Sequence, residues 1–203
     1  MDKDAERERD RELSRRAARQ DRSAFAELYE RHAEGVRRLL LARGAPEEAA
    51  WDLVQETFTR ALRHLDRGRG PDRFDLWIRR IALNASADHW RTPHVLREES
   101  ADPWTLPEAA ARDPDWAAGE AIRQAIRSLD KALRDAVILH FYEDLSVQEA
   151  AEVLRIPPGT VKSRLSRAYR RLATTLGIER ETQGRVEMRP VKVRNLRKGG
   201  NEA

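Results

Sequence analysis

The side chains with the clearest chemistry are five cations near the carboxyl-terminal end of the chain: Lys162, Arg164, Arg167, Arg170 and Arg171. No acidic residue lies between them. Cations at this density neutralise phosphates, and some of them can donate hydrogen bonds to base edges. Nucleic acid is therefore the first partner to consider.

These cations need a helix that presents them together, and the sequence LSVQEAAEVLRIPPGTVKSRLSRAYRRL predicts one. Ser146 is a candidate N-cap, and Glu149 completes a capping box at the start of a first helix. The segment 157–159 ends that helix, and Thr160 is a candidate cap for a second, basic helix. The inward-facing residues of the second helix are predicted to be Val161, Leu165 and Leu172. Such a helix pair is the helix-turn-helix way of entering the major groove.

The position of a residue along the second helix predicts whether it contacts base edges or phosphates. Residues early in the helix are expected to read base edges: Lys162, Ser163, Arg164 and Arg167. Residues at its start are expected to bring backbone amides near phosphate: Pro158, Gly159 and Thr160. Farther along, Arg170 and Arg171 are expected to contact phosphates or solvent.

Composition favours a helical protein and excludes several classes of site. The 203 residues carry 36% charged side chains but a net charge of only +4, which indicates mixed, solvated helix faces. There is no cysteine, so disulfides and thiolate ligands are excluded. No run approaches the roughly 20 apolar residues of a membrane span. Residues 1–20 lack the apolar core of a signal peptide, so we expect a cytoplasmic protein without membrane insertion.

Periodicity predicts an all-α fold with two small helical domains joined by a flexible acidic linker. Residues 1–20 read as a solvated helix or a disordered tail, and a charged tail is favoured. A helical bundle is expected over 21–91 and a four-helix domain over 119–177. The intervening 92–118 holds four prolines and six acids against two arginines, which predicts a linker. Residues 178–203 are expected to be a flexible basic tail.

Two tryptophans, Trp104 and Trp116, are unusual in a linker. They could dock on a neighbouring domain or anchor the segment in a partner's channel, and the sequence leaves both open.

Catalytic chemistry has no candidate residues in this sequence. The five histidines are scattered without a metal-binding spacing, and His32 and His140 fall on predicted buried stripes. There is no glycine-rich phosphate loop and no nucleophile elbow. We therefore expect no enzyme activity, no metal and no cofactor.

Four motifs together resemble bacterial sigma-70 factors of the extracytoplasmic-function (ECF) subfamily. AFAELYERHAEGVRRL and DLVQETFTRALRHL resemble the first two helices of sigma region 2, and RFDLWIRRIALNASADHWR resembles its promoter-melting helix. The helix-turn-helix string resembles sigma region 4. The resemblance covers about residues 21–91 and 120–177.

This resemblance implies roles for residues that are otherwise ordinary surface positions. Asp52, Gln55 and Glu56 would contact the clamp helices of the largest polymerase subunit, although a solvated helix face is the default reading. Region 4 would contact the flap of the second-largest subunit. The −10 element would be read and melted by Arg67, Arg69, Arg73, Arg80, Asn84, Asp88, Trp90 and Arg91. Trp77 could pack in the core or stack on a base, and its spacing with the apolar residues of the helix favours the core.

Three positions depart from the family's usual pattern. Arg79 stands where an aromatic residue is common, and Leu83 where a polar residue is common. Arg155 occupies a turn position that often holds glycine. A positive φ there would cost arginine about 1 kcal/mol, or the side chain could add a phosphate contact at the −35 element.

The resemblance implies a factor that binds core RNA polymerase and recognises the −35 and −10 promoter elements. The resemblance also implies an anti-sigma factor as a partner. The alternative is a stand-alone helix-turn-helix regulator, because other regulators share a TVKxxL helix. The first ninety residues show neither the βα alternation of a receiver domain nor coiled-coil heptads.

Overall fold

The computed structural model describes residues 3–89 and 114–177, with the backbone alone at positions 3, 88–89 and 114–120. The described residues form α-helices and one π-helical turn, with no strand among them, which confirms the predicted all-α class. We call residues 3–89 the N-terminal half and residues 114–177 the C-terminal half. The predicted basic tail and most of the predicted linker, with Trp104, lie outside the described residues.

Three long helices of the N-terminal half surround one core: α2 (Arg22–Arg43), α3 (Glu47–Leu65) and α4 (Phe74–His89). The apolar stripes expected from the sequence face this core. Their most buried members are Leu28, Val36, Leu39, Leu40, Val54, Ala61, Leu65, Phe74, Ile78 and Ala82. Caps define the ends of α2: the Asp21 carboxylate accepts from the amides of Ser23 and Ala24, and Gly44 closes the helix at φ 105°.

The first twenty residues correct our prediction of a charged tail. Within this segment, Lys3–Ala17 form helix α1, which packs against α2 and α4. Leu13 is fully buried in this contact and Ala17 is 2% exposed. The tail prediction was wrong because two apolar side chains, four residues apart, are enough to dock a helix whose other faces are charged.

Polar contacts hold α1 in register with the rest of the N-terminal half. The Asp10 carboxylate accepts from Arg31 Nε and pairs with His32 Nε2, each at 2.7 Å. Burial alone would raise the pKa of Asp10, but the hydrogen bonds with His32 and Arg31 outweigh it and keep that pKa below its usual value. Ser14 Oγ donates to the Pro71 carbonyl at 3.1 Å. Helix α1 is therefore an integral part of this half.

The C-terminal half consists of α6 (Pro114–Arg127), α7 (Lys131–Val137) with a π turn (Ile138–Tyr142), α8 (Val147–Leu154) and α9 (Pro158–Thr175). Helix α6 begins at Pro114, so residues 114–118 are helical and not linker as we predicted. The side chain of Trp116 is not described. The remaining helices supply a core that includes Leu133, Ile138, Leu139, Ala150, Val161 and Leu165.

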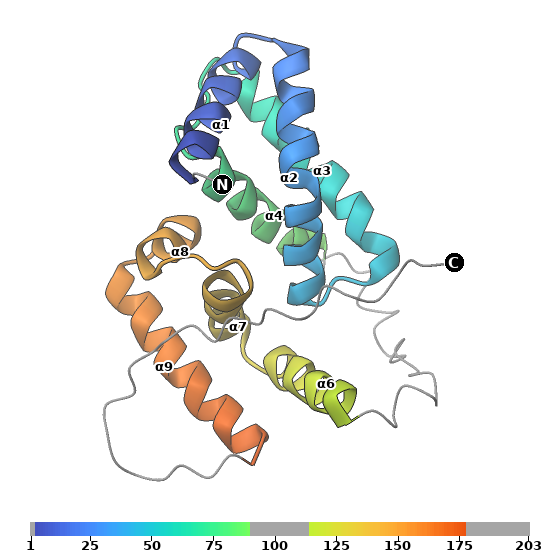
Figure 1. Ribbon diagram of the computed structural model, residues 1–203, viewed down its shortest axis with the longest axis vertical. Coiled ribbons are helices and arrows are strands. Elements are labelled where there is room, and N and C mark those ends of the chain that lie inside the picture. Colours follow the sequence, from blue (N-terminus) through green and yellow to red (C-terminus); the bar gives the residue numbers. More distant parts are fainter. Residues whose placement is uncertain (1–2, 90–113, 178–203) are drawn as a thin grey trace.

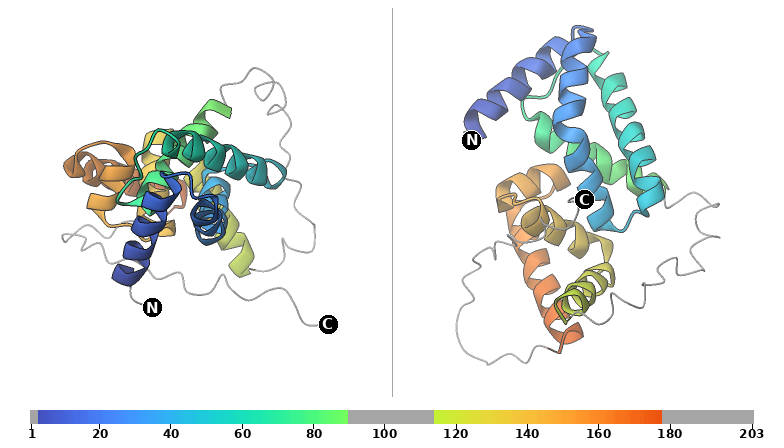
Figure 2. Two further views of the ribbon diagram at one scale, coloured as in Figure 1. Left: turned by 90° about the horizontal axis from the view of Figure 1, so that it is seen from above. Right: turned by 45° about the vertical axis from the view of Figure 1, so that its right-hand side comes forward.

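The two halves pack against each other and share one continuous cluster of buried residues. Helix α4 of the N-terminal half lies against α8, and α2 lies against the π turn. Figures 1 and 2 show this junction between the upper and lower parts of the molecule. Within the described residues, the promoter-element candidates of both halves are therefore held on one compact body.

Candidate nucleic-acid and polymerase interfaces

The helix-turn-helix predicted at residues 145–172 is formed by α8 and α9. Ser146 Oγ accepts from the Glu149 amide at 3.1 Å, and the Glu149 carboxylate accepts from the Ser146 amide at 3.0 Å. This is the predicted capping box. Helix α9 buries Val161, Leu165 and Ala168 completely, while Leu172 is partly buried. The inward face therefore fixes which side chains the helix presents to solvent.

The start of α9 differs from the prediction in one respect. The helix begins at Pro158 after Pro157, so Thr160 lies inside the first turn and is not the N-cap. Its amide donates to the Pro157 carbonyl at 2.9 Å, and proline has no N–H to donate. The predicted contact between a backbone amide and phosphate therefore remains for Gly159, and not for Pro158 or Thr160.

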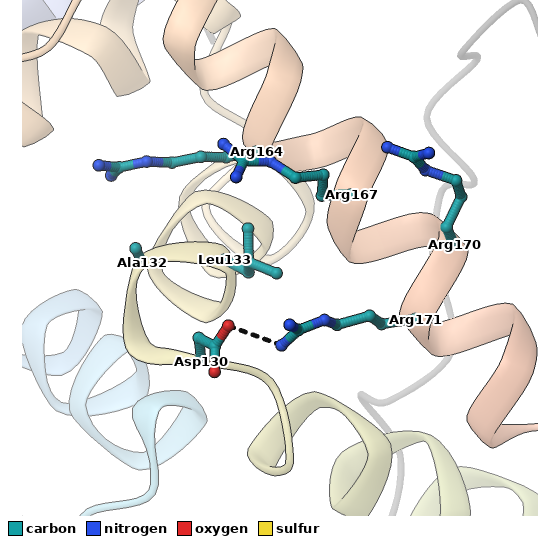
Figure 3. Close-up of a pocket in the computed structure, with 7 residues that line it drawn as sticks. All are labelled: Asp130, Ala132, Leu133, Arg164, Arg167, Arg170 and Arg171. Atoms are coloured by element: carbon teal, nitrogen blue, oxygen red, sulfur yellow. Dashed lines mark hydrogen bonds and ion pairs between the residues drawn. The ribbon is translucent and has the colours of Figure 1, made fainter.

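The cations of α9 gather around a shallow hollow of about 470 Å³ (Figure 3). Four arginines line it: Arg164, Arg167, Arg170 and Arg171. The acid in the lining, Asp130, pairs with Arg171 at 2.6 Å. Lys162 and Ser163 are exposed on the same helix. The remaining arginines leave this surface strongly cationic, which suits a polyanion.

Arg155 adopts the left-handed conformation that its position in the turn suggested. Its φ is 53° and its ψ is 47°, and it is the C-cap of α8. Its amide donates to the Glu152 carbonyl at 3.3 Å. The side chain is exposed, so it is available for a contact in spite of the backbone cost.

The candidates for the −10 element fall on the loop before α4 and on α4 itself. Arg67 and Arg69 are exposed on the loop, and Asn84 is exposed on α4. Arg80 is partly buried; burial and the nearby Arg155 both lower the pKa of its guanidinium. Asp88 lies in α4 without a described side chain, and Trp90 and Arg91 lie outside the described residues.

Arg73 is engaged in ion pairs in this conformation. Its guanidinium contacts the Asp75 and Glu149 carboxylates at 3.0 and 2.9 Å. The hydrogen bond with Asp75 is the main reason why the pKa of Arg73 is raised, although burial opposes it. Arg73 is therefore bonded to carboxylates at the position where a phosphate contact was expected.

A second groove, of about 610 Å³, brings together residues expected at the two promoter elements. Arg80 and Asn84 of α4 line one wall, and Arg155 and Arg164 line the other. Trp77 also lines it, partly buried with its ring centroid 5.7 Å from that of Phe74. Trp77 packs against the core as predicted.

The polar face of α3 carries the candidates for polymerase contact. Asp52 and Gln55 are exposed, and Glu56 pairs with Arg60 at 2.7 Å. Sequence reasoning missed their neighbour Trp51, which is 45% exposed. The Arg37 guanidinium lies 5.6 Å from its ring centroid. The signal was a tryptophan directly before Asp52, at the edge of the apolar stripe of α3.

The described residues hold no group of three or more histidine, aspartate and glutamate side chains able to bind a metal ion. None of the described helices is both long and apolar enough to cross a membrane.

Comparison with known proteins agrees with this arrangement of helices. Residues 28–93 match the family described as sigma-70 region 2, and residues 119–172 match sigma-70, region 4. The RNA polymerase sigma-H factor of Pseudomonas aeruginosa is 30% identical over 181 residues, which cover 79% of this chain and 90% of that protein. The chain belongs to the ECF subfamily of the sigma-70 family.

Other relatives fit the same assignment. The ECF RNA polymerase sigma factor BldN of Streptomyces coelicolor is 33% identical over 172 residues, which cover 81% of this chain and 65% of BldN. The chain thus spans slightly less than two thirds of the length of BldN. The structure of CnrH in complex with the cytosolic domain of CnrY aligns with a TM-score of 0.64 at 29% identity, covering 85% of this sigma factor and 99% of CnrH.

Proposed function

We propose that this ECF sigma factor binds core RNA polymerase and directs initiation at promoters with a −35 and a −10 element. The observation that carries the proposal is the exposed cationic face of α9, whose orientation is set by burial of Val161 and Leu165 on the opposite side of the helix. The same chain also carries a region 2 fold. The factor supplies specificity, and polymerisation belongs to the core enzyme. It would act in the cytoplasm, where core polymerase is found.

Region 4 would place α9 in the major groove of the −35 element. Lys162, Ser163, Arg164 and Arg167 would reach base edges, while Arg170 would neutralise phosphate. The start of the helix would add backbone contacts through Gly159, and Arg155 would reach phosphate from the turn. Arg171 would first have to leave Asp130, so it is the weaker phosphate candidate.

Region 2 would read and open the −10 element with the surface of α4 and the loop before it. Exposed cations and the Asn84 amide suit backbone and base contacts with separated strands. The contact residues proposed here are Arg67, Arg69, Arg73, Arg80, Asn84, Asp88, Trp90 and Arg91. Arg73 can contribute only after it separates from Glu149.

The polar face of α3 would dock on the clamp helices of the largest polymerase subunit through Asp52, Gln55 and Glu56. An exposed tryptophan beside them suits such an interface, because aromatic side chains are enriched among residues that dominate binding energy. Region 4 would contact the flap of the second-largest subunit. An anti-sigma factor is a further proposed partner, supported by the CnrH structure, in which the relative is held by the cytosolic domain of CnrY.

The decisive experiment mixes the purified chain with core polymerase and promoter fragments and measures specific transcripts. Co-elution with core polymerase and promoter-dependent transcripts are expected. If the chain binds promoter DNA alone but never co-elutes with core polymerase, the stand-alone regulator replaces this proposal.

The proposed polymerase surface has its own test. Alanines at Asp52, Gln55 and Glu56 should weaken core binding and leave the thermal midpoint nearly unchanged, because exposed side chains contribute little to stability. Glu12→Ala with Glu30→Ala, which removes exposed acids from α1 and α2, is the matched control. A large fall in the midpoint of the triple variant would make these residues structural.

The −35 contacts can be separated by their sequence dependence. Arg164→Ala should cost about 1–3 kcal/mol at a cognate site if this arginine reads a base. An equal loss on all DNA sequences would instead assign Arg164 to phosphate.

A further inference from the structure

Helix α1 contacts the loop of residues 66–73, which joins α3 to α4. Ser14 of α1 donates from Oγ to the Pro71 carbonyl at 3.1 Å, and Arg11 donates from Nε to the Asp72 carboxylate at 2.8 Å. Arg11 and Ser14 are three residues apart in the helix, so they share one face of it. This face of α1 therefore holds the second half of the loop.

Gly70 shows how closely the loop lies against α1. A Cβ at this position would collide with the backbone carbonyl and the hydroxyl of Ser14. Gly70 does not have a positive φ, whereas Gly68 has a φ of 85°. The turn thus explains the glycine at position 68, and the approach of α1 explains the glycine at position 70. Any side chain at Gly70 would push the loop away from the helix.

Burial decides which of these contacts can fix the loop. The side chains of Arg11 and Asp72 are 40% and 73% exposed, and exposed ion pairs contribute little. Ser14 is fully buried, and loss of its hydroxyl would leave the Pro71 carbonyl without this donor. The contact of Ser14 with the backbone at Gly70 and Pro71 is therefore the one that matters.

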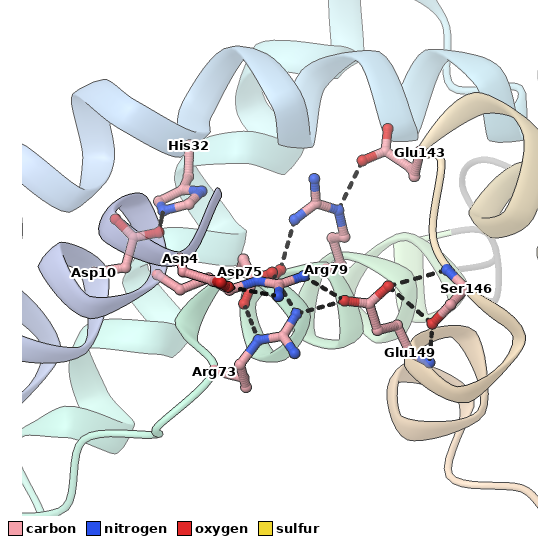
Figure 4. A network of polar contacts seen from close by, with 10 residues as sticks. Asp4, Asp10, His32, Arg73, Asp75, Arg79, Glu143, Ser146 and Glu149 are labelled. Atoms are coloured by element: carbon pink, nitrogen blue, oxygen red, sulfur yellow. Dashed lines mark hydrogen bonds and ion pairs between the residues drawn. The ribbon is translucent and has the colours of Figure 1, made fainter. Parts of the chain in front are cut away.

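Helix α1 is itself anchored, so it can serve as a fixed support for the loop. Leu13, directly before Ser14, has no exposed surface. One turn earlier, the Asp10 carboxylate pairs with His32 of α2, as Figure 4 shows. The position of the loop is therefore tied through α1 to the core of the N-terminal half.

Two exposed arginines of the loop lie at or beside the points where it is held. The Gly68 amide donates to the Leu65 carbonyl at 2.8 Å, which ties the start of the loop to the end of α3. Arg69 lies between this glycine and Gly70, and Arg67 comes directly before it. Both arginine side chains are exposed. The place from which each guanidinium extends is thus set by α3 on one side and by α1 on the other.

The proposed function gives this arrangement a consequence, and the following inference rests on that function. Arg67 and Arg69 are proposed contacts of the −10 element. A side chain that must reach a particular base has to be held within a fraction of an ångström to about 1 Å, which requires support behind it. In this loop the support is α1.

We propose that α1 determines specificity at the −10 element and that Ser14 is a positioning residue, which acts through the loop. Ser14 has no exposed surface, so it does not reach DNA itself. Helix α1 also precedes residues 28–93, the segment that matches sigma-70 region 2. The choice of −10 sequence therefore depends on a buried residue outside that segment.

The test measures base preference with the assembled enzyme. The full-length chain and core polymerase are mixed with promoter fragments randomised at the −10 element, and transcripts are counted for each sequence. Ser14→Ala should lower the ratio between the preferred and the next-best base by about two- to tenfold, the range that one hydrogen bond supplies. Fragments randomised at the −35 element are the internal reference, and preference there should not change.

Thr57→Val is the matched control. Thr57 is also fully buried, and its Oγ1 donates to the Leu53 carbonyl at 2.7 Å within α3. The change removes a comparable hydrogen bond away from the loop, so it should lower the thermal midpoint and leave the −10 preference intact. If Ser14→Ala lowers transcription equally on all −10 sequences, its role is structural and the inference is overturned.

Gly70→Ala tests the same contact from the side of the loop. It should also weaken the −10 preference, because the added Cβ displaces the loop from α1. Adding Ser14→Ala to Gly70→Ala should change the preference little further, since the contact is already broken. Effects that multiply in the double variant would show that the two residues act separately, which contradicts the proposed contact.

The unmodified chain separates this inference from the proposed function. If its holoenzyme shows no preference among −10 sequences, the proposed function fails and the positioning role of Ser14 fails with it. If it prefers defined −10 sequences and Ser14→Ala keeps that preference, the proposed function stands and the inference alone fails.

Discussion

Replacement of Leu13 by alanine should destabilise the protein by about 3 kcal/mol, because α1 is an integral helix. Leu13 has no exposed surface and packs where α1 meets the rest of the N-terminal half. Full burial of a leucine side chain is worth about 1.5–3 kcal/mol, and the cavity left by truncation brings the usual cost to about 2–5 kcal/mol. A site near the surface can relax, so a value near the middle of that range is expected.

Urea unfolding followed by circular dichroism would measure this loss as a lower midpoint with an unchanged slope. For a chain of this size, about 3 kcal/mol corresponds to roughly 6–12 °C in the thermal midpoint. Glu12→Ala, at the exposed neighbouring position, is the control and should stay within about 0.5 kcal/mol. If Leu13→Ala changes stability no more than the control does, α1 is a peripheral tail after all.

Three further changes probe the backbone and one carboxylate. Gly70→Ala should destabilise the protein, because a Cβ at this position would lie 2.4 Å from the Ser14 carbonyl oxygen of α1; Gly159→Ala, which meets open space, is the control in the same unfolding assay. Arg155→Gly should raise the unfolding free energy by up to about 1 kcal/mol through relief of its positive φ, and a clear loss would show that the side chain outweighs the strain. Glu149 has its pKa lowered from 4.5 to about 2, so its contribution to stability should be fully present above about pH 4.5 and lost as the pH falls toward 2. Unfolding titrations should therefore show a shallower acid dependence for Glu149→Gln, and identical profiles would contradict the assigned cause.

The sequence predicted correctly those features that depend on residues close together in the chain. The capping box at Ser146, the buried stripe of α9 and the left-handed Arg155 each depend on residues within a few positions of one another. The stripes of α2, α3 and α4 were equally predictable, because apolar residues at helical spacing have few other ways to be buried.

Long-range contacts could not be predicted in the same way. Helix α1 has a short apolar stripe among many charges, so its docking depends on the cavity that the other helices offer. The pairing of Arg43 with Asp135 joins residues 92 positions apart. Nothing near either residue marks it as buried, and charged side chains are rarely buried unless they are paired. The start of α9 at Pro158 was missed because threonine is a good N-cap, yet proline in the first turn is equally acceptable.

The two positions at which α4 departs from the sigma pattern both face the junction with region 4. Arg79, where an aromatic residue is common, pairs with Glu143, and Leu83, where a polar residue is common, is 5% exposed and lines the interdomain groove. A guanidinium suits a carboxylate partner, and an aliphatic side chain suits a surface that another domain covers. The departures are therefore better explained by contact within this chain than by a changed base preference.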